Sequence, residues 1–362
     1  MDIDRLLKLM LDKGASDLHI KVPGPPVFRI DGELVRQENE PPVIPQDVRD
    51  VFEQITNPQQ RDTFLAECEL DFAYSISGLA RFRVSVMQQR GTISLAFRMV
   101  PFEVPSIDDL GLPPVCKELI LKRRGLILIT GATGTGKSST LAAMISYLNE
   151  SSNRNIITIE DPIEFLFHDK KCLIRQRDLG DDTKSFPVAL RHALRHDPDV
   201  IVVGEMRDLD TISTAITAAE TGHLVLGTLH TVDATQTVDR IIDVFPPAQQ
   251  QQIRLQLSQV IEAVLSQTLV SCIGGGRTAA LEIMIANSTI RKLILQERVL
   301  ELSGNIAVSS REGMQTLNKA LADLVGRGVI TREESMSKTN NPVDLDRLLQ
   351  SLSGVSRQSD DS

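Results

Sequence analysis

The sequence predicts an α/β protein in which a mainly parallel sheet, covered by helices on both faces, follows a smaller α+β module. Short, continuous apolar runs predict the parallel sheet, because strands that are buried on both faces do not alternate with polar residues. These runs lie at residues 126–129, 156–159, 200–203 and 224–226. Alternating apolar and polar residues before residue 100 predict the smaller module.

The smaller module is expected at residues 1–100. Apolar residues at helical spacing predict a first helix over residues 3–12. The Asp31-Gly32 turn separates two expected strands. Residues 45–66 are expected to be helical, and further strands are expected at residues 72–74, 80–87 and 93–99.

Residues 101–110 form the predicted linker or hinge, since Pro101 and Pro105 favour extended backbone. The parallel-sheet domain, with a helical C-terminal part, is then expected at residues 111–350. The polar residues 351–362 are expected to form a disordered tail.

The composition disfavours several classes of protein. The chain has 39 Lys and Arg against 48 Asp and Glu, and this net charge of −9 does not suit a protein that mainly binds nucleic-acid phosphates. With no Trp and two Tyr, it also lacks the aromatic residues of a stacking platform for single strands. Its four cysteines lack Cys-x-x-Cys spacing and are expected to be free thiols in a reducing cytosol. No apolar run approaches the roughly 20 residues that a bilayer crossing needs, so a cytoplasmic protein is expected.

A Gly-x4-Gly-Lys-Ser motif carries the strongest chemical signal. It follows an expected buried strand and precedes a helical stretch, which is the context that a phosphate-binding loop requires. The backbone N–H groups of such a loop and the helix N-terminus bind phosphates. Lys137 is expected to reach the β- and γ-phosphates of ATP, and the Ser138 hydroxyl to ligate Mg²⁺. The predicted nucleotide-binding residues are Gly131, Ala132, Thr133, Gly134, Thr135, Gly136, Lys137, Ser138 and Ser139.

Carboxylates follow two of the expected strands. Glu205 follows the run at residues 200–203 after Gly204, and the length of its side chain suits contact with Mg²⁺ through a water ligand. Residues 160–164 contain three carboxylates; Glu164 is the candidate for the base that deprotonates the attacking water, and Glu160 is expected to support it. A surface acidic turn is the alternative for this segment.

Two histidines stand at the two ends of the expected strand at residues 224–229. His223 and His230 are about 20 Å apart on an extended strand, which argues against a shared metal. His230, nearer the carboxyl end, is expected to sense the phosphate state. For His223 a catalytic role and a buried structural role are equal alternatives.

Taken together, these motifs resemble those of the secretion-type P-loop ATPases. The loop at 131–138, residues 159–164, Gly204-Glu205 and residues 221–231 are similar to the Walker A, Asp box, Walker B and His box of that superfamily. Within it, the chain resembles the PilT group, the type IV pilus retraction ATPases. The segments that carry this second resemblance are residues 15–20, 313–317 and 328–331.

The resemblance implies a homohexamer in which a PAS-like N-terminal domain precedes a RecA-like P-loop motor domain, with ATP held between them. It implies that arginines of a neighbour's N-terminal domain complete the catalytic site, and Arg81 and Arg83 match them; solvated strand side chains are the alternative reading. The implied partners are an inner-membrane pilus platform protein at the cytoplasmic face of the membrane and a paralogous motor ATPase, but no nucleic acid.

Residues 289–296 depart from a motif that the family links to retraction. Arg291 and its apolar neighbours match that motif, whereas Leu295 and Gln296 replace an Arg-Glu pair. The assembly motors carry a four-cysteine zinc element, which Cys172 and Cys272 cannot form alone, so no zinc is expected and retraction is favoured. Three alternatives stay open: a pilus-assembly or type II secretion motor, a non-hydrolysing nucleotide-binding regulator, and a nucleic-acid translocase.

Overall fold

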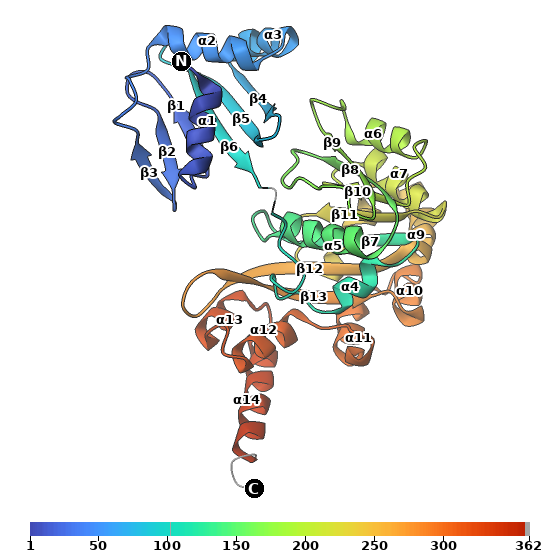
Figure 1. Cartoon of the computed structure of the whole chain (residues 1–362). Coiled ribbons are helices and arrows are strands. Elements are labelled where there is room, and N and C mark those ends of the chain that lie inside the picture. The colour runs from blue at the N-terminus through green and yellow to red at the C-terminus, as the bar shows by residue number, and fades with distance from the viewer. Residues whose placement is uncertain (102, 359–362) are drawn as a thin grey trace. The chain divides into compact units, whose positions relative to one another are not determined.

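The chain divides into two compact units in a computed structural model that describes residues 1–101 and 103–358 (Figure 1). The first unit comprises Met1–Glu103 and the short segment Glu164–Leu166. The other described residues form the second unit, so the division falls at residue 103, inside the predicted linker.

The first unit is a six-stranded antiparallel sheet with three helices. Its strand order is β3-β2-β1-β6-β5-β4. The strands are β1 (Asp17–Ile20), β2 (Val27–Ile30), β3 (Glu33–Arg36), β4 (Glu69–Ile76), β5 (Ala80–Gln89) and β6 (Thr92–Val100), and the helices are α1 (Ile3–Asp12), α2 (Pro45–Ile55) and α3 (Pro58–Glu67). Apolar side chains of all three helices join those of the sheet in one core.

The expected single helical segment at residues 45–66 is two helices. The backbone is extended at Thr56, and Asn57 then begins α3 by accepting a hydrogen bond from the Gln60 N–H at 2.9 Å. Pro58 occupies the first turn, where its missing N–H costs nothing. The chain thus breaks at Thr56, and the cap at Asn57 starts the second helix.

The second unit is built on a seven-stranded sheet with the order β13-β12-β7-β11-β10-β8-β9. All neighbouring strands are parallel except β12 and β13. The strands are β7 (Gly125–Thr130), β8 (Asn155–Glu160), β9 (Leu173–Asp178), β10 (Val200–Val203), β11 (Leu224–Leu229), β12 (Ile261–Ser271) and β13 (Arg277–Ile285). The helices are α4 (Val115–Ile120), α5 (Lys137–Ser151), α6 (Phe186–Ala193), α7 (Leu209–Glu220), α8 (Ala234–Asp243), α9 (Pro247–Val260), α10 (Ser288–Leu295), η1 (Val299–Glu301), α11 (Leu302–Val308), η2 (Ser310–Glu312), α12 (Leu317–Gly326), α13 (Arg332–Lys338) and α14 (Pro342–Gln358).

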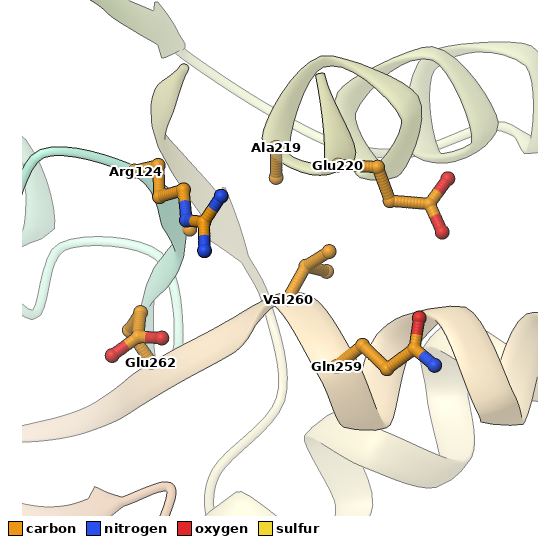
Figure 2. Close-up of a pocket in the computed structure, with 7 residues that line it drawn as sticks. Arg124, Ala219, Glu220, Gln259, Val260 and Glu262 are labelled. Carbon is orange, nitrogen blue, oxygen red and sulfur yellow. The ribbon is translucent and has the colours of Figure 1, made fainter. Parts of the chain in front are cut away.

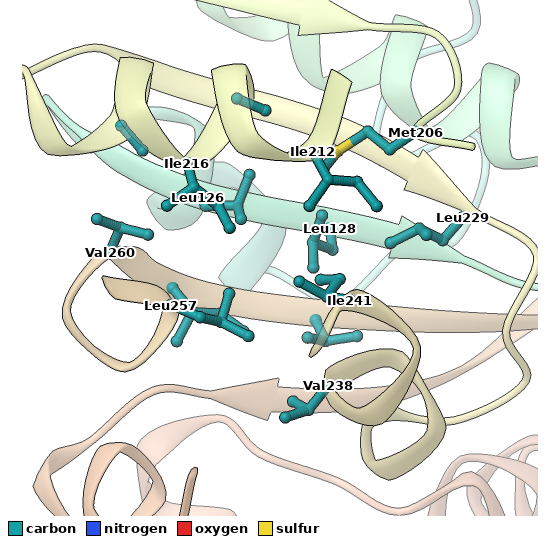
Figure 3. Close-up of a cluster of buried hydrophobic side chains, with 14 of the residues drawn as sticks. Leu126, Leu128, Met206, Ile212, Ile216, Leu229, Val238, Ile241, Leu257 and Val260 are labelled. Carbon is teal, nitrogen blue, oxygen red and sulfur yellow. The ribbon is translucent and has the colours of Figure 1, made fainter. Parts of the chain in front are cut away.

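Helices cover both faces of this sheet, which explains the continuous apolar runs. Leu126 and Leu128 of β7 join a core with α7, α8 and α9 (Figure 3). Ile127 and Ile129, on the opposite face, join a second core with α4 and α5. Because successive side chains of a strand point to opposite faces, every residue of β7 must be apolar or small.

The sequence pattern did not predict β9, β12 or β13. The polar residues Ser266, Gln267 and Thr268 interrupt the apolar pattern of β12. The prediction of a disordered tail from Ser351 was wrong in part, because α14 continues to Gln358. Residues 359–362 of that predicted tail lie outside the described residues.

Other sequence expectations concern cysteines and membrane spans. All four cysteines are free thiols, and burial raises the pKa of Cys116 to about 12, as for a small core residue. Among the described helices, none is long and apolar enough to cross a bilayer.

Candidate active site

A glycine-rich loop joins β7 to α5 at the carboxyl edge of the sheet. Gly131, Gly134 and Gly136 all have positive φ angles, of 144°, 79° and 87°. A Cβ atom on Gly131 would lie 2.4 Å from the Gln267 carbonyl oxygen, so only glycine fits there. Gly136 begins α5 without a side-chain cap, which leaves the first N–H groups of that helix to a ligand.

Lys137 folds back over this loop. Its side chain is buried, and its Nζ donates to the carbonyl oxygens of Gly131 at 2.8 Å and Ala132 at 3.0 Å. A cationic group is thus held at the glycine-rich loop, next to the uncapped N-terminus of α5. This combination binds a polyphosphate through charge and hydrogen bonds together.

Gln267 of β12 braces the loop from below, a role that the sequence analysis missed. Its Nε2 donates to the Thr135 carbonyl oxygen at 2.7 Å, and its Oε1 accepts from the Thr140 hydroxyl at 2.8 Å. Next to it on β12, Ser266 accepts from the Thr130 hydroxyl at 2.9 Å. The only sequence signal for this brace is the polar run Ser266, Gln267 and Thr268 within β12.

We expect Gln267→Leu to weaken ADP binding about tenfold, because the buried Thr135 carbonyl and Thr140 hydroxyl would lose their partner and the loop would relax. Isothermal calorimetry with ADP measures the change. Gln249→Leu, on the exposed surface of α9, is the matched control. Unchanged affinity in Gln267→Leu would contradict the bracing role.

The carboxyl ends of four neighbouring strands gather most of the predicted site residues. In spatial order, β7, β11, β10 and β8 carry the glycine-rich loop, His230, Glu205 and Glu160. These residues lie along one edge because parallel strands present their carboxyl ends together.

Glu205 is held by two basic side chains. His230 Nε2 lies 2.9 Å from a Glu205 carboxylate oxygen, and Arg207 Nε contacts the same oxygen. Burial raises the pKa of Glu205, but the hydrogen bond from Arg207 and the charges of Arg207 and His230 lower it more, so that the pKa lies below its usual value. Glu205 is therefore an ionised acceptor at neutral pH. Arg207 is thus a further residue at this edge, which the sequence pattern did not indicate.

The two glutamates of the 160–164 segment separate in the structure. Glu160 ends β8, and its Oε1 accepts from the Thr158 hydroxyl at 2.6 Å and from Gln176 Nε2 at 3.1 Å. Glu164 belongs to the short segment that groups with the first unit. Its role as the base therefore stays a prediction.

His223 lies at the opposite edge of the sheet from the glycine-rich loop. It precedes β11, its Nδ1 is 2.9 Å from the Ala218 carbonyl oxygen, and its own carbonyl accepts from the Gly125 N–H at 3.0 Å. The whole length of β11 separates it from His230, because a strand carries its two ends to opposite edges. Within one chain His223 therefore does not lie beside His230 and Glu205, and a catalytic role for it stays a prediction.

A pocket of about 260 Å³ opens at this amino edge (Figure 2). Arg124 lines it just before β7, Glu220 at the end of α7, and Glu262 near the start of β12. Because the glycine-rich loop is at the other edge, this pocket is not the phosphate site.

Arg81 and Arg83 lie on one face of β5 in the first unit. The intervening Phe82 and the following Val84 are fully buried, so the arginines point away from the core. Arg83 is opposite Arg98 in register, and Arg98 Nε in turn donates to Asp17 at 2.7 Å. This face is basic, and the catalytic role of Arg81 and Arg83 stays a prediction.

Arg291, which residues 289–296 share with the retraction-linked motif, is turned inward. It donates to Glu262 at 2.7 Å and to the Ser258 and Gln259 carbonyl oxygens at the end of α9, at 2.9 and 2.7 Å. These bonds attach α10 to α9 and β12. Arg291 therefore serves the packing of the helix on which it lies.

Comparison with known proteins identifies the family. A family model described as "Type II/IV secretion system protein" matches residues 1–275. The type IV pilus retraction ATPase PilT of Pseudomonas aeruginosa is 48% identical over 342 residues, which are 94% of this chain and 99% of the relative. The chain belongs to the PilT family of secretion ATPases.

Two further PilT-related proteins support this membership. A twitching motility protein of Neisseria gonorrhoeae is 43% identical over 317 residues, covering 87% of this chain and 84% of the relative. A crystal structure of the pilus retraction motor PilT with bound ADP superposes with a TM-score of 0.88 at 44% identity, covering 96% of this chain and 99% of that one.

The PilT membership fixes the fold and the class of enzyme. The second unit is a RecA-like P-loop motor domain, preceded by a smaller α+β domain. The chain is an ATPase that binds a nucleotide. That the glycine-rich loop is the nucleotide site stays a prediction. Because the likeness to retraction ATPases runs along almost the whole chain, the assembly-motor and regulator alternatives are not favoured.

Proposed function

We propose that this chain is a homohexameric ATP-driven motor that retracts type IV pili from the cytoplasmic face of the inner membrane. One observation carries the proposal: a phosphate-binding edge with Lys137, His230 and Glu205 occurs in a chain that matches a retraction ATPase over 94% of its length. A membrane platform protein of the pilus is the proposed partner, and a paralogous motor ATPase is a further one.

The chemistry follows from the geometry of the carboxyl edge. The loop N–H groups and Lys137 bind the β- and γ-phosphates and neutralise charge that develops in the transition state. Glu164 accepts a proton from the attacking water, and Glu160 supports the segment. Arg81 and Arg83 of a neighbouring subunit supply further cations. His230 bonds to Glu205 at 2.9 Å and thus links the end of β11 to that of β10.

Mg²⁺ fits the donors that this edge offers. Among the described residues, no group of three or more His, Cys, Asp and Glu could form a protein cage for a metal. A hydroxyl from Ser138 and the ionised Glu205, acting through water, suit an ion that keeps most of its water ligands and binds phosphates. The ion would neutralise phosphate charge when it is bound.

The motor step is proposed to be rigid-body movement of the two units about the linker at residues 101–110. Binding of ATP would favour one arrangement, and hydrolysis with release would favour another. The force would then pass through the ring to the platform protein.

A deletion strain tests the proposed function. We expect cells that lack this gene to carry surface pili but to lose twitching, because retraction fails while assembly continues. Electron microscopy counts the pili, and stab-agar assays measure twitching. Restoration by the wild-type gene is the control, and cells without surface pili would instead indicate an assembly motor.

A further inference from the structure

Glu282 of β13 places a second carboxylate at the N-terminus of α8. Its Oε1 accepts from the Ala234 N–H at 2.9 Å. The ordinary N-cap residue Asp233 already accepts from the Gln236 N–H at 2.7 Å. Helix N-termini attract negative charge, and here two acidic side chains from distant parts of the sequence share one.

The helix that Glu282 anchors begins four residues after His230. Within this connection the Thr231 and Thr237 hydroxyls are 2.6 Å apart, and Thr237 also donates to the Asp233 carbonyl oxygen at 2.6 Å. The connection is therefore tied to the first turn of α8. The position of that turn therefore constrains the position of His230, which directly follows β11.

Glu282 also belongs to the row of residues that supports the phosphate loop. It pairs in register with Ser266 of β12, and Ser266 pairs with Thr130 of β7, the last residue before the loop. Thr130 in turn pairs with Leu229, the residue before His230. One row of the sheet thus connects Glu282 with both the loop and the histidine.

This carboxylate is costly to the fold. Burial, with a smaller contribution from the charge of Asp233, raises the pKa of Glu282 to about 7. The backbone bond from Ala234 lowers it only in part. Because the folded pKa lies above the unfolded value near 4.5, stability falls as pH rises from about 4.5 to 7, and the full cost is present at pH 8. A neutral side chain at this position would make the folded protein more stable at pH 8. The presence of a carboxylate instead indicates a functional role.

We propose that Glu282 is a positioning residue for hydrolysis: its carboxylate anchors the start of α8 and so holds His230 against Glu205. The inference rests on the proposed ATPase mechanism, in which His230 acts at the phosphate edge. Glu282 lies in the sheet and bonds to Ala234, whereas His230 bonds to Glu205 at 2.9 Å. Glu282 therefore acts on His230 through the residues that join β11 to α8.

The test compares ATP hydrolysis by the purified full-length wild type and Glu282→Gln, which keeps the shape and an acceptor but loses the charge. At pH 8 we expect kcat to fall about tenfold with KM for ATP within about twofold. Wild-type kcat should decline as pH falls through 7, because Glu282 becomes protonated, whereas kcat of Glu282→Gln should stay at its low level. Near pH 6 the two enzymes should differ by less than about twofold.

A double mutant decides whether the effect passes through His230. We expect Glu282→Gln to have no further effect on kcat in a His230→Ala background, since the two residues act in one series. The proposal would be overturned if the fold loss in kcat of the double variant equalled the product of the two single losses. It would also be overturned if His230→Ala kept the wild-type kcat. The thermal midpoint of Glu282→Gln should not fall at pH 8, and a fall that accompanies the loss of activity would indicate a merely structural role.

Glu301→Gln is the matched control, because Glu301 is an exposed carboxylate paired with Arg298 at 2.6 Å. It should leave kcat and its pH profile unchanged. The proposed function can fail separately. If the wild type hydrolyses ATP but Glu282→Gln matches it at every pH, only the positioning role falls, whereas a deletion strain that still twitches removes the retraction function alone.

Discussion

Lys137→Ala is expected to lower the rate of ATP hydrolysis by about 10³-fold, because Lys137 supplies the one buried cation at the glycine-rich loop among the described residues of the second unit. Its Nζ lies over the loop at 2.8 Å from the Gly131 carbonyl oxygen, where the β- and γ-phosphates would bind. Phosphate release by the purified protein measures the rate. Calorimetry should also show that most of the heat of nucleotide binding is lost.

Lys8→Ala, which removes an exposed lysine of α1, controls for the loss of a positive charge and should hydrolyse ATP normally. The thermal midpoint of Lys137→Ala should stay within about 4 °C of the wild type, so that the lost activity is not lost folding. A Lys137→Ala protein that bound ADP with unchanged heat would remove the glycine-rich loop as the nucleotide site.

The sequence predicted those parts of the site that follow from local pattern. The glycine-rich loop needs only glycines at positive φ between a buried strand and a helix, and all three conditions can be read from neighbouring residues. Glu205 and His230 were predicted to belong to the site because each lies at the carboxyl end of an expected buried strand. Parallel strands then bring their carboxyl ends together without further information.

The supporting residues could not be predicted because they act across the fold. Gln267 reaches Thr135 and Thr140 from a strand more than a hundred residues later, and Glu282 reaches Ala234 from the edge of the sheet. Both lie on β12 or β13, whose polar residues obscured the strand pattern. Register and strand order, not composition, give these side chains their roles.

His223 shows what local pattern leaves open, because its sequence context gave a catalytic and a buried structural role as equal alternatives. Both histidines lie within residues 221–231, yet β11 carries them to opposite edges of the sheet. Arg291 matches the retraction-linked motif, and the structure adds that its guanidinium bonds inward to Glu262. A motif specifies residues, but the strand or helix that carries them decides what they face.

The choice of catalytic base shows how contacts can rank two glutamates of one segment. Glu160 Oε1 already accepts hydrogen bonds from Thr158 and Gln176, so the carboxylate is held toward the sheet. A base needs an oxygen that can accept a proton from water in line with the γ-phosphate. Glu164, four residues later and beyond the end of β8, is the better candidate.

Glu164→Gln is therefore expected to lower the single-turnover rate of ATP hydrolysis about 10³-fold while ADP affinity stays within about twofold. Glu160→Gln should lower that rate only about tenfold, because both bonds end on Oε1, where an amide oxygen can still accept from Thr158 and Gln176, and only the charge is lost. Glu118→Gln, on the exposed surface of α4, is the control for loss of a carboxylate and should match the wild type. Quenched-flow measurement of phosphate release at saturating ATP distinguishes the three variants. If Glu160→Gln were the inactive variant and Glu164→Gln hydrolysed normally, the base would lie at the end of β8, and the hydrogen bonds that hold Glu160 would be those that aim it.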